Sequence, residues 1–160
     1  MIGERKPFSR AAYDECDGPA KWAVATHLHH SHHKVEVPPE SYGVDMCSNL
    51  GPIIFYHEVE VFKNWTQGNF PFTTGSIPGR KIRLLESIPY DCPLYFWRLR
   101  FDLARALVFS SKWMIDKFLV EVPNKEIADG EFFYRVPVVY GKEFDLLPTE
   151  EVHYSENTDG

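Results

Sequence analysis

The segment 53–63 constrains the fold of this chain more than any other part of the sequence. It reads IIFYHEVEVFK, which is rich in β-branched and aromatic residues and contains no glycine or proline, and such a run predicts a long β-strand. The turn-forming residues 48–52 precede it, and the segment 42–47 before them reads as another strand. The sequence therefore predicts an antiparallel hairpin with a loop of moderate length.

Two glutamates lie on one face of this predicted strand. Because side chains alternate between the faces of a strand, Glu58 and Glu60 point to one side, and the neighbouring valines point to the other side, toward the core. Asp45 on the partner strand can reach the glutamates. Carboxylates this close repel one another unless a cation neutralises them. Ligands that are all oxygen suit Mg²⁺ or Mn²⁺ better than zinc, so Asp45, Glu58 and Glu60 are candidate metal ligands.

Such a site predicts phosphodiester hydrolysis. A divalent cation held by carboxylates lowers the pKa of a bound water and stabilises charge on a scissile phosphate. The alternative interpretation of a bare Glu-Val-Glu sequence is an exposed strand face that carries alternating acids.

The other segments predict an α/β fold around a mixed β-sheet. Asp17 and Pro19 indicate the start of a helix that continues through residues 19–30, and the segment 34–37 reads as a short strand. Residues 93–101 form another strand candidate, whereas 103–111 fits either a strand or a helix. The remaining expected elements are a short helix over 111–118, late strands or extended edges over 118–124 and 131–140, and a loose tail from about residue 150.

The composition fits one globular domain over residues 1–160, with 44% hydrophobic and 15% aromatic residues. No apolar run approaches the roughly 20 residues that a membrane span needs, and we expect no signal peptide. Cys16, Cys47 and Cys92 are scattered, which favours a reducing cytoplasm without a disulfide framework or a zinc ribbon. The net charge of -6 argues against a nucleic-acid partner, although carboxylates that bind a cation add to this formal count.

The order of a helix, a Tyr-Gly-Val-Asp strand, a turn and a His-Glu-Val-Glu-Val strand resembles the PD-(D/E)XK nuclease superfamily. The resemblance covers roughly residues 10–110 and extends past the hairpin. Trp65 is followed by Asn69-Phe70-Pro71-Phe72-Thr73-Thr74 and by Ile77-Pro78-Gly79-Arg80-Lys81, a succession similar to that of phage-encoded members. The resemblance implies a restriction-endonuclease-like core, in which a mixed β-sheet is flanked by helices. It also implies that Asp45 and a hairpin glutamate bind magnesium, and that a lysine two residues after the second acid assists the attacking water.

This chain departs from the family pattern at that lysine. Phe62 stands where the relatives place it, after Glu60 and Val61. Glu60 can take the lysine position, as in an E-x-E variant of some restriction enzymes, or a β-bulge can turn Lys63 to the acidic face. Lys81 can also supply the cation from the next segment. We favour the E-x-E arrangement or Lys81, and a fourth alternative is that catalysis is lost and only binding remains.

Other candidate residues carry weaker signals. Arg80 and Lys81 follow a stretch rich in glycine and proline and can hold a phosphate, although a basic pair in a loop is often only solvated. Relatives often place a further acid on the first helix, for which Glu15, beside Asp14, is a candidate. His29 and His33 share a face if the helix extends that far, which suits Zn²⁺ or Ni²⁺, although exposed histidines at a helix end need no metal.

These observations predict a Mg²⁺-dependent or Mn²⁺-dependent endonuclease or exonuclease that acts on nucleic acid, with DNA favoured. We expect it in the cytoplasm of a bacterial or phage-infected cell, and its aromatic content leaves room for a homodimer. A non-catalytic binding or virion-associated module with the nuclease fold is the main alternative, which Phe62 and the acidic net charge favour. A His-rich protein that binds a transition metal is the other alternative.

Overall fold

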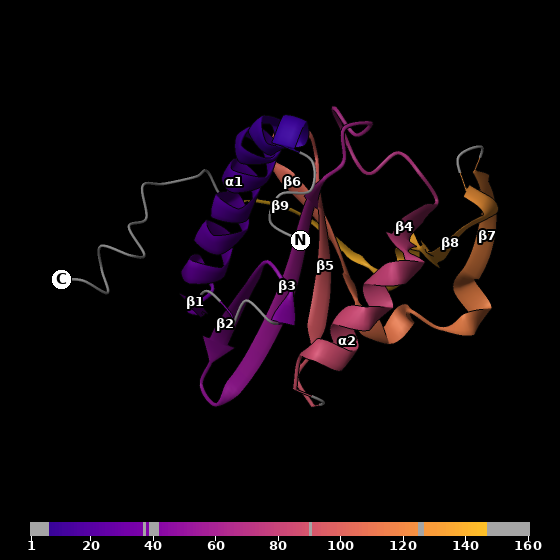
Figure 1. Cartoon of the computed structure of the whole chain (residues 1–160). Helices are drawn as coiled ribbons and strands as arrows, with labels where there is room; N and C mark the ends of the chain where they lie inside the picture. Colours follow the sequence, from indigo (N-terminus) through magenta and orange to yellow (C-terminus); the bar gives the residue numbers. More distant parts are fainter. Residues whose placement is uncertain (1–6, 37, 39–41, 90, 125–126, 147–160) are drawn as a thin grey trace.

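A computed structural model describes residues 7–36, 38, 42–89, 91–124 and 127–146 of the chain. Within these residues, two helices and nine strands form the regular elements (Figure 1), together with short 3-10 helices. In chain order the regular elements are α1 (Pro7–His30), β1 (Lys34–Glu36), β2 (Met46–Leu50), β3 (Ile53–Val61), β4 (Thr74–Pro78), α2 (Leu84–Ser87), β5 (Leu94–Leu99), β6 (Arg105–Ser110), β7 (Leu119–Asn124), β8 (Ile127–Pro137) and β9 (Lys142–Asp145). This content confirms the predicted α/β class.

A six-stranded mixed sheet forms the centre of the fold, in the order β1-β2-β3-β5-β6-β9. Strands β3 and β5 are parallel, and every other neighbouring pair in this sheet is antiparallel. A parallel pair needs a long crossover connection, and residues 62–93 supply it here. The predicted mixed sheet is therefore confirmed.

Helix α1 covers one face of this sheet (Figure 1). Its buried residues include Ala20, Val24 and Leu28, whose spacing of four places them on one stripe of the helix. They pack against Val59 of β3 and Trp97 of β5. The small alanines on this stripe allow the helix to lie close to the sheet.

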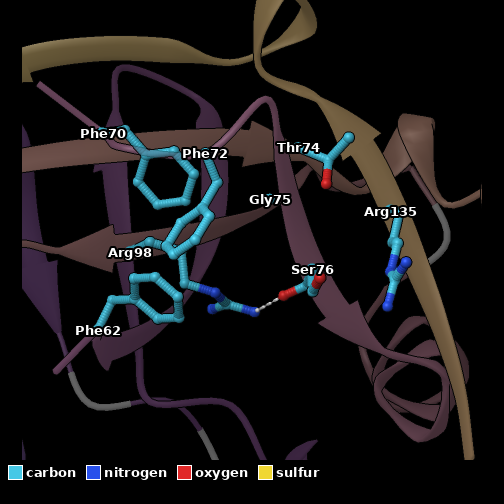
Figure 2. A pocket seen from close by; sticks show the side chains of 8 residues that line it. All are labelled: Phe62, Phe70, Phe72, Thr74, Gly75, Ser76, Arg98 and Arg135. Carbon is cyan, nitrogen blue, oxygen red and sulfur yellow. Dashed lines mark hydrogen bonds between the residues drawn. The ribbon is translucent and has the colours of Figure 1, made fainter. Parts of the chain in front are cut away.

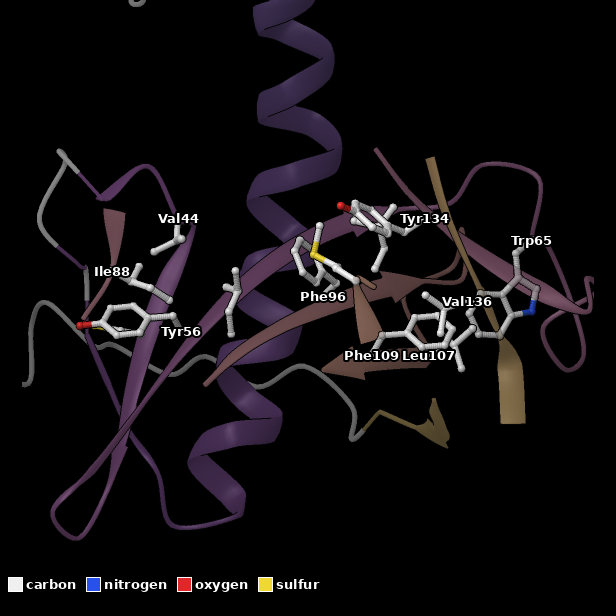
Figure 3. Close-up of a cluster of buried hydrophobic side chains, with 13 residues drawn as sticks. Val44, Tyr56, Trp65, Ile88, Phe96, Leu107, Phe109, Tyr134 and Val136 are labelled. Carbon is white, nitrogen blue, oxygen red and sulfur yellow. The ribbon is translucent and has the colours of Figure 1, made fainter. Parts of the chain in front are cut away.

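The opposite face is covered by a second, three-stranded antiparallel sheet in the order β4-β8-β7, with α2 beside it (Figure 1). A larger buried cluster fills the space between these layers and includes Trp65, Phe96, Phe109, Tyr134 and Val136 (Figure 3). The resemblance implied a sheet flanked by helices, and on this face strands accompany helix α2. Residues 74–78 and 127–137 pair with each other as strands, and Ile77, Tyr134 and Val136 from them are part of this buried cluster.

The loop that connects the two strands of the hairpin is shorter than the sequence predicted. Strand β2 begins at Met46 and continues through residues assigned to the turn, so that Met46 pairs with His57 and Leu50 pairs with Ile53. Only Gly51 and Pro52 connect the strands, and Gly51 adopts φ 62°, a left-handed conformation that glycine tolerates.

Other element boundaries also differ from expectation. Helix α1 begins at Pro7, not near Asp17, and contains Pro19, because one proline removes one hydrogen bond without ending a helix whose other turns persist. The ambiguous segment 103–111 contains strand β6, and two 3-10 helices, Ser111–Trp113 and Asp116–Phe118, replace the predicted helix. The tail predicted to be loose lies outside the described residues. Within the described part of the chain, no helix combines the length and apolar character that crossing a membrane requires.

Candidate active site

Asp45 and Glu58 form an interlocked pair of carboxylates at the open end of the hairpin. The backbone N–H of Asp45 donates a hydrogen bond to Oε2 of Glu58 at 3.0 Å. In return, the backbone N–H of Val59 donates to Oδ2 of Asp45 at 2.7 Å. Strand pairing places Asp45 one step beyond the Met46–His57 pair, so the β2–β3 register itself brings the two acids together.

Each carboxylate of this pair also contacts a lysine from another element. Nζ of Lys81 lies 2.7 Å from Oε1 of Glu58 and donates a hydrogen bond to it. Nζ of Lys21 lies 3.3 Å from Oδ1 of Asp45. Lys81 comes from the 3-10 helix Gly79–Arg83 in the crossover, whereas Lys21 comes from α1. Two cations from opposite sides of the sheet therefore compensate the charge of the acid pair.

Burial dominates the electrostatics of Glu58, which is only 6% exposed. Removal from water raises the pKa of its carboxyl, and the charge of Asp45 raises that pKa further. Lys81 and the N–H of Asp45 oppose both effects. The pKa of Glu58 lies above its usual value, because burial and the charge of Asp45 outweigh the opposing contacts.

Glu60 lies on the same face of β3 but does not join the acid pair. Its side chain is 56% exposed and its Oε1 lies 3.3 Å from Nη1 of Arg98. Arg98 stands opposite Glu60 on β5 and is buried, and its Nη2 donates to the carbonyl oxygen of Ser76 at 3.0 Å. Burial lowers the pKa of Arg98, and Glu60 and Glu58 oppose that effect. Charges of opposite sign thus alternate along this face as Lys81, Glu58, Arg98 and Glu60.

The alternation of faces along β3 follows the sequence prediction. Val59 packs in the core beneath α1, while Glu58 points to the side of the second sheet. Lys63 lies beyond the end of the strand, in an exposed turn, so no bulge brings it to the acids. Of the two lysines considered from the sequence, Lys63 and Lys81, it is Lys81 that contacts the acid pair.

The weaker candidates lie elsewhere. Arg80 is exposed beside Lys81. Glu15 falls within α1, but its side chain is outside what the structure describes. The helix ends at His30, so His29 and His33 do not share a helical face, and Nδ1 of His33 instead lies 2.8 Å from Oγ of Ser48. The i, i+4 arrangement considered for these histidines does not form, because a turn at residues 31–32 separates them.

The carboxylates of Asp45 and Glu58 provide part of the ligand set that was expected for a divalent cation. Among the described residues, no group of three or more His, Cys, Asp and Glu side chains is arranged to hold a metal ion, which differs from the expected convergence of three carboxylates. Two carboxylates are nevertheless sufficient for Mg²⁺, which usually keeps several of its waters. Oδ1 of Asp45 and Oε1 of Glu58 would be its protein ligands, and each now faces an ammonium group.

Comparisons with known proteins do not supply an identity. No family model, curated protein or solved structure gives a significant match to this chain.

A pocket of about 270 Å³ adjoins this charged face (Figure 2). Arg98 lines it together with aromatic residues on one side and residues of β4 and β8 on the other; the full lining is Phe62, Phe70, Phe72, Thr74, Gly75, Ser76, Arg98 and Arg135.

Two residues of the site were not among the sequence candidates. Lys21 stands 24 positions before Asp45 on a helix, and no local pattern indicates that its ammonium reaches the hairpin. Arg98 is placed opposite Glu60 only by the parallel pairing of β3 with β5.

Proposed function

We propose that this chain is a metal-dependent nuclease that hydrolyses phosphodiester bonds of nucleic acid, with DNA as the favoured substrate. One observation carries the proposal: hydrogen bonds hold together the carboxylates of Asp45, the residue before β2, and Glu58 on β3, with the ammonium of Lys81 2.7 Å from Glu58. The PD-(D/E)XK resemblance implies this combination of two hairpin acids and a lysine. In this chain the lysine comes from the crossover instead of from β3.

The protein's own residues have separable roles in this proposal. The backbone N–H groups of Asp45 and Val59 fix one oxygen of each carboxylate, so the other oxygen of each is oriented before any ligand arrives. A divalent cation bound there would supply a water of lowered pKa and stabilise charge on the phosphate. Lys81 is positioned to orient that water or to contact a phosphate oxygen once it leaves Glu58. Arg98 restrains Glu60 at the side of the site.

The test is cleavage of plasmid and single-stranded circular DNA in the presence of Mg²⁺ or Mn²⁺. We expect Asp45→Asn and Glu58→Gln to lower the cleavage rate at least about a hundredfold, because each removes a ligand charge. Lys81→Met is expected to lower the rate to a similar extent. Glu121→Gln, an exposed acid on β7, is the matched control and should cleave like the wild type. Equal cleavage by the wild type and Asp45→Asn would overturn the proposal.

A second candidate function is a nuclease-like module that binds nucleic acid without cutting it. The specific observation in its favour is that both acids already have a lysine partner, so the pair is compensated without a metal ion. DNA binding without any cleavage in Mg²⁺ or Mn²⁺ would select this function.

A further inference from the structure

The pocket in Figure 2 has an aromatic wall that the acid pair does not use. Phe62, Phe70 and Phe72 contact one another, with ring centroids 5.6 to 5.8 Å apart. Phe72 is 48% exposed, although a phenyl ring gains by being covered. Its ring is therefore available to a flat apolar partner that enters the pocket.

The facing side of the pocket is polar and positively charged. Arg135 of β8 is exposed and pairs in register with Ser76 of β4, whose carbonyl oxygen accepts from Arg98. Thr74 adds a hydroxyl group on the same strand. Arg98 is held by Glu60 and Ser76, so its position is fixed before a ligand binds. A ligand that fits has a flat ring for the phenylalanines and an anionic group for Arg135.

The pocket and the acid pair lie along one strand face. Glu58, Glu60 and Phe62 are successive residues on the same side of the β3 line, and a strand advances about 3.3 Å per residue, so Phe62 lies about 13 Å beyond Glu58. Arg98 lines the pocket and pairs with Glu60, which stands between Glu58 and Phe62 on this face. An extended polymer that carries both flat rings and anionic groups can therefore contact the pocket and the acid pair at the same time.

We propose that this pocket binds the base of an unpaired nucleotide in single-stranded nucleic acid, stacked on Phe72, with a flanking phosphate on Arg135. The proposal rests on the proposed nuclease function and specifies its substrate as a strand with unpaired bases next to the cleavage point. In a duplex the bases are paired and stacked, so none is free to enter unless it is extruded. Aromatic side chains bind single strands by stacking on bases of any sequence.

The experiment measures binding of a fluorescently labelled oligothymidylate by anisotropy, at fixed salt and in EDTA, so that no cleavage occurs. We expect Phe72→Ala to weaken binding about tenfold, which is within the range for loss of one stacked base. Phe72→Tyr should bind like the wild type because it keeps the ring. The matched control is Phe101→Ala, which removes a phenylalanine that is 52% exposed outside the pocket and should not change binding.

The charged side is tested by salt dependence. Arg135→Gln should weaken binding and lower the slope of log affinity against log salt by about 1, because one phosphate contact is lost. Lys142→Gln, which removes an exposed positive charge on β9, should leave the slope unchanged. Circular dichroism of each variant shows that it is folded. Thymidine monophosphate binding as tightly as the oligonucleotide would overturn the assignment to a strand.

The outcomes separate this proposal from the nuclease itself. One outcome is that cleavage depends on Asp45 but folded Phe72→Ala binds oligothymidylate as tightly as the wild type. This result would overturn the pocket proposal and would still support the nuclease proposal. Binding that depends on Phe72, without any Asp45-dependent cleavage, supports the pocket and overturns the nuclease. The substitution Phe72→Ala could also weaken binding of a blunt duplex as much as binding of the single strand. This result would overturn the proposed preference for unpaired bases.

Discussion

At the scale of single residues, the ring of Phe109 is held between two glycines. A Cβ placed on Gly75 would lie 2.3 Å from Cε2 of this ring, and one on Gly141 would lie 2.7 Å from Cε1. Phe109 is fully buried, so its ring is enclosed by neighbouring residues. The absence of side chains at these two positions is what allows β4 and the start of β9 to approach the core this closely. Gly75 also lines the pocket, so the same close approach shapes that site.

The first prediction follows from this packing. Gly75→Ala is expected to lower the free energy of unfolding by about 1–3 kcal/mol, because overpacking a rigid core costs that much. Urea denaturation measures it. The cost should shrink in a Phe109→Leu background, which opens space for the methyl group. Gly18→Ala is the control, because nothing lies within 4 Å of its added Cβ and alanine favours a helix, so it should be neutral or stabilising.

A buried histidine gives a second residue-scale prediction. The indole N–H of Trp97 donates to Nδ1 of His57 at 3.0 Å, so the neutral ring carries its proton on Nε2, which faces Oγ of Ser48 at 2.9 Å. Burial, assisted by the charge of His33, lowers the pKa of His57 to about 3. Protonation would place an unpaired charge in the core and break the contact with Trp97.

The sign of the pH effect follows from the two pKa values. The unfolded histidine titrates near its ordinary value of 6.5, so between pH 6.5 and 3 the unfolded chain binds one more proton than the folded chain. The free energy of unfolding should therefore fall as the pH is lowered through this range, by up to about 1.4 kcal/mol per pH unit from this residue. Urea denaturation at several pH values should show a shallower dependence in His57→Asn. An equal dependence in both proteins would contradict the assignment.

At the scale of elements, the acid pair also fastens the open end of the hairpin. Glu58 accepts a hydrogen bond from the backbone N–H of Asp45, and Asp45 accepts one from the backbone N–H of Val59. Both bonds lie next to the Met46–His57 pair, where the pairing of β2 with β3 ends. Lys81 then connects the crossover to β3, and Lys21 connects α1 to the residue before β2. The side chains that form the candidate site therefore also join the hairpin, the crossover and α1 to one another.

The element-scale prediction concerns the Lys81–Glu58 pair. Lys81→Met should lower the free energy of unfolding by about 1–3 kcal/mol at pH 8, less than for a fully buried pair because Lys81 is 32% exposed. The loss arises because Glu58 stays buried without its cation, and the pKa of Glu58 should rise further. The destabilisation should diminish as the pH is lowered, because Glu58 can then take up a proton. Adding Glu58→Gln should restore much of the stability, and a double-mutant cycle by urea denaturation tests this.

At the scale of the whole molecule, one connection builds most of the functional face. The crossover 62–93, which the parallel pairing of β3 with β5 requires, carries Phe70, Phe72 and Lys81. It also contains β4, which joins the second sheet. The pocket and the lysine of the acid pair are therefore consequences of the sheet topology.

The whole-molecule prediction is that a divalent cation stabilises the fold through Asp45. A ligand that binds only the folded state adds about 2.7 kcal/mol when present at a hundred times its dissociation constant. Mg²⁺ or Mn²⁺ should therefore raise the melting temperature of the wild type in differential scanning fluorimetry, while Na⁺ at equal ionic strength should not. The increase should be absent in Asp45→Asn and kept in Glu121→Gln. The same increase in Asp45→Asn would place the cation elsewhere.

The sequence by itself determined the local features. Alternation along residues 53–61 determined which glutamates share a face, and the order of segments predicted a mixed sheet, because strand periodicity and strand propensity depend only on neighbouring residues. Local signals did not determine the tight turn at Gly51, the continuation of α1 through Pro19 or the second sheet, because long-range pairing and packing outweigh them.

Tertiary structure decided which charges meet. Asp45 and Glu58 are joined by strand register, whereas Glu60 pairs with Arg98 because β5 lies parallel beside β3. Lys21 and Lys81 reach the acids from segments 24 positions before Asp45 and 23 positions after Glu58. A charge interacts with whatever lies a few ångströms away, and only the folded backbone fixes those distances.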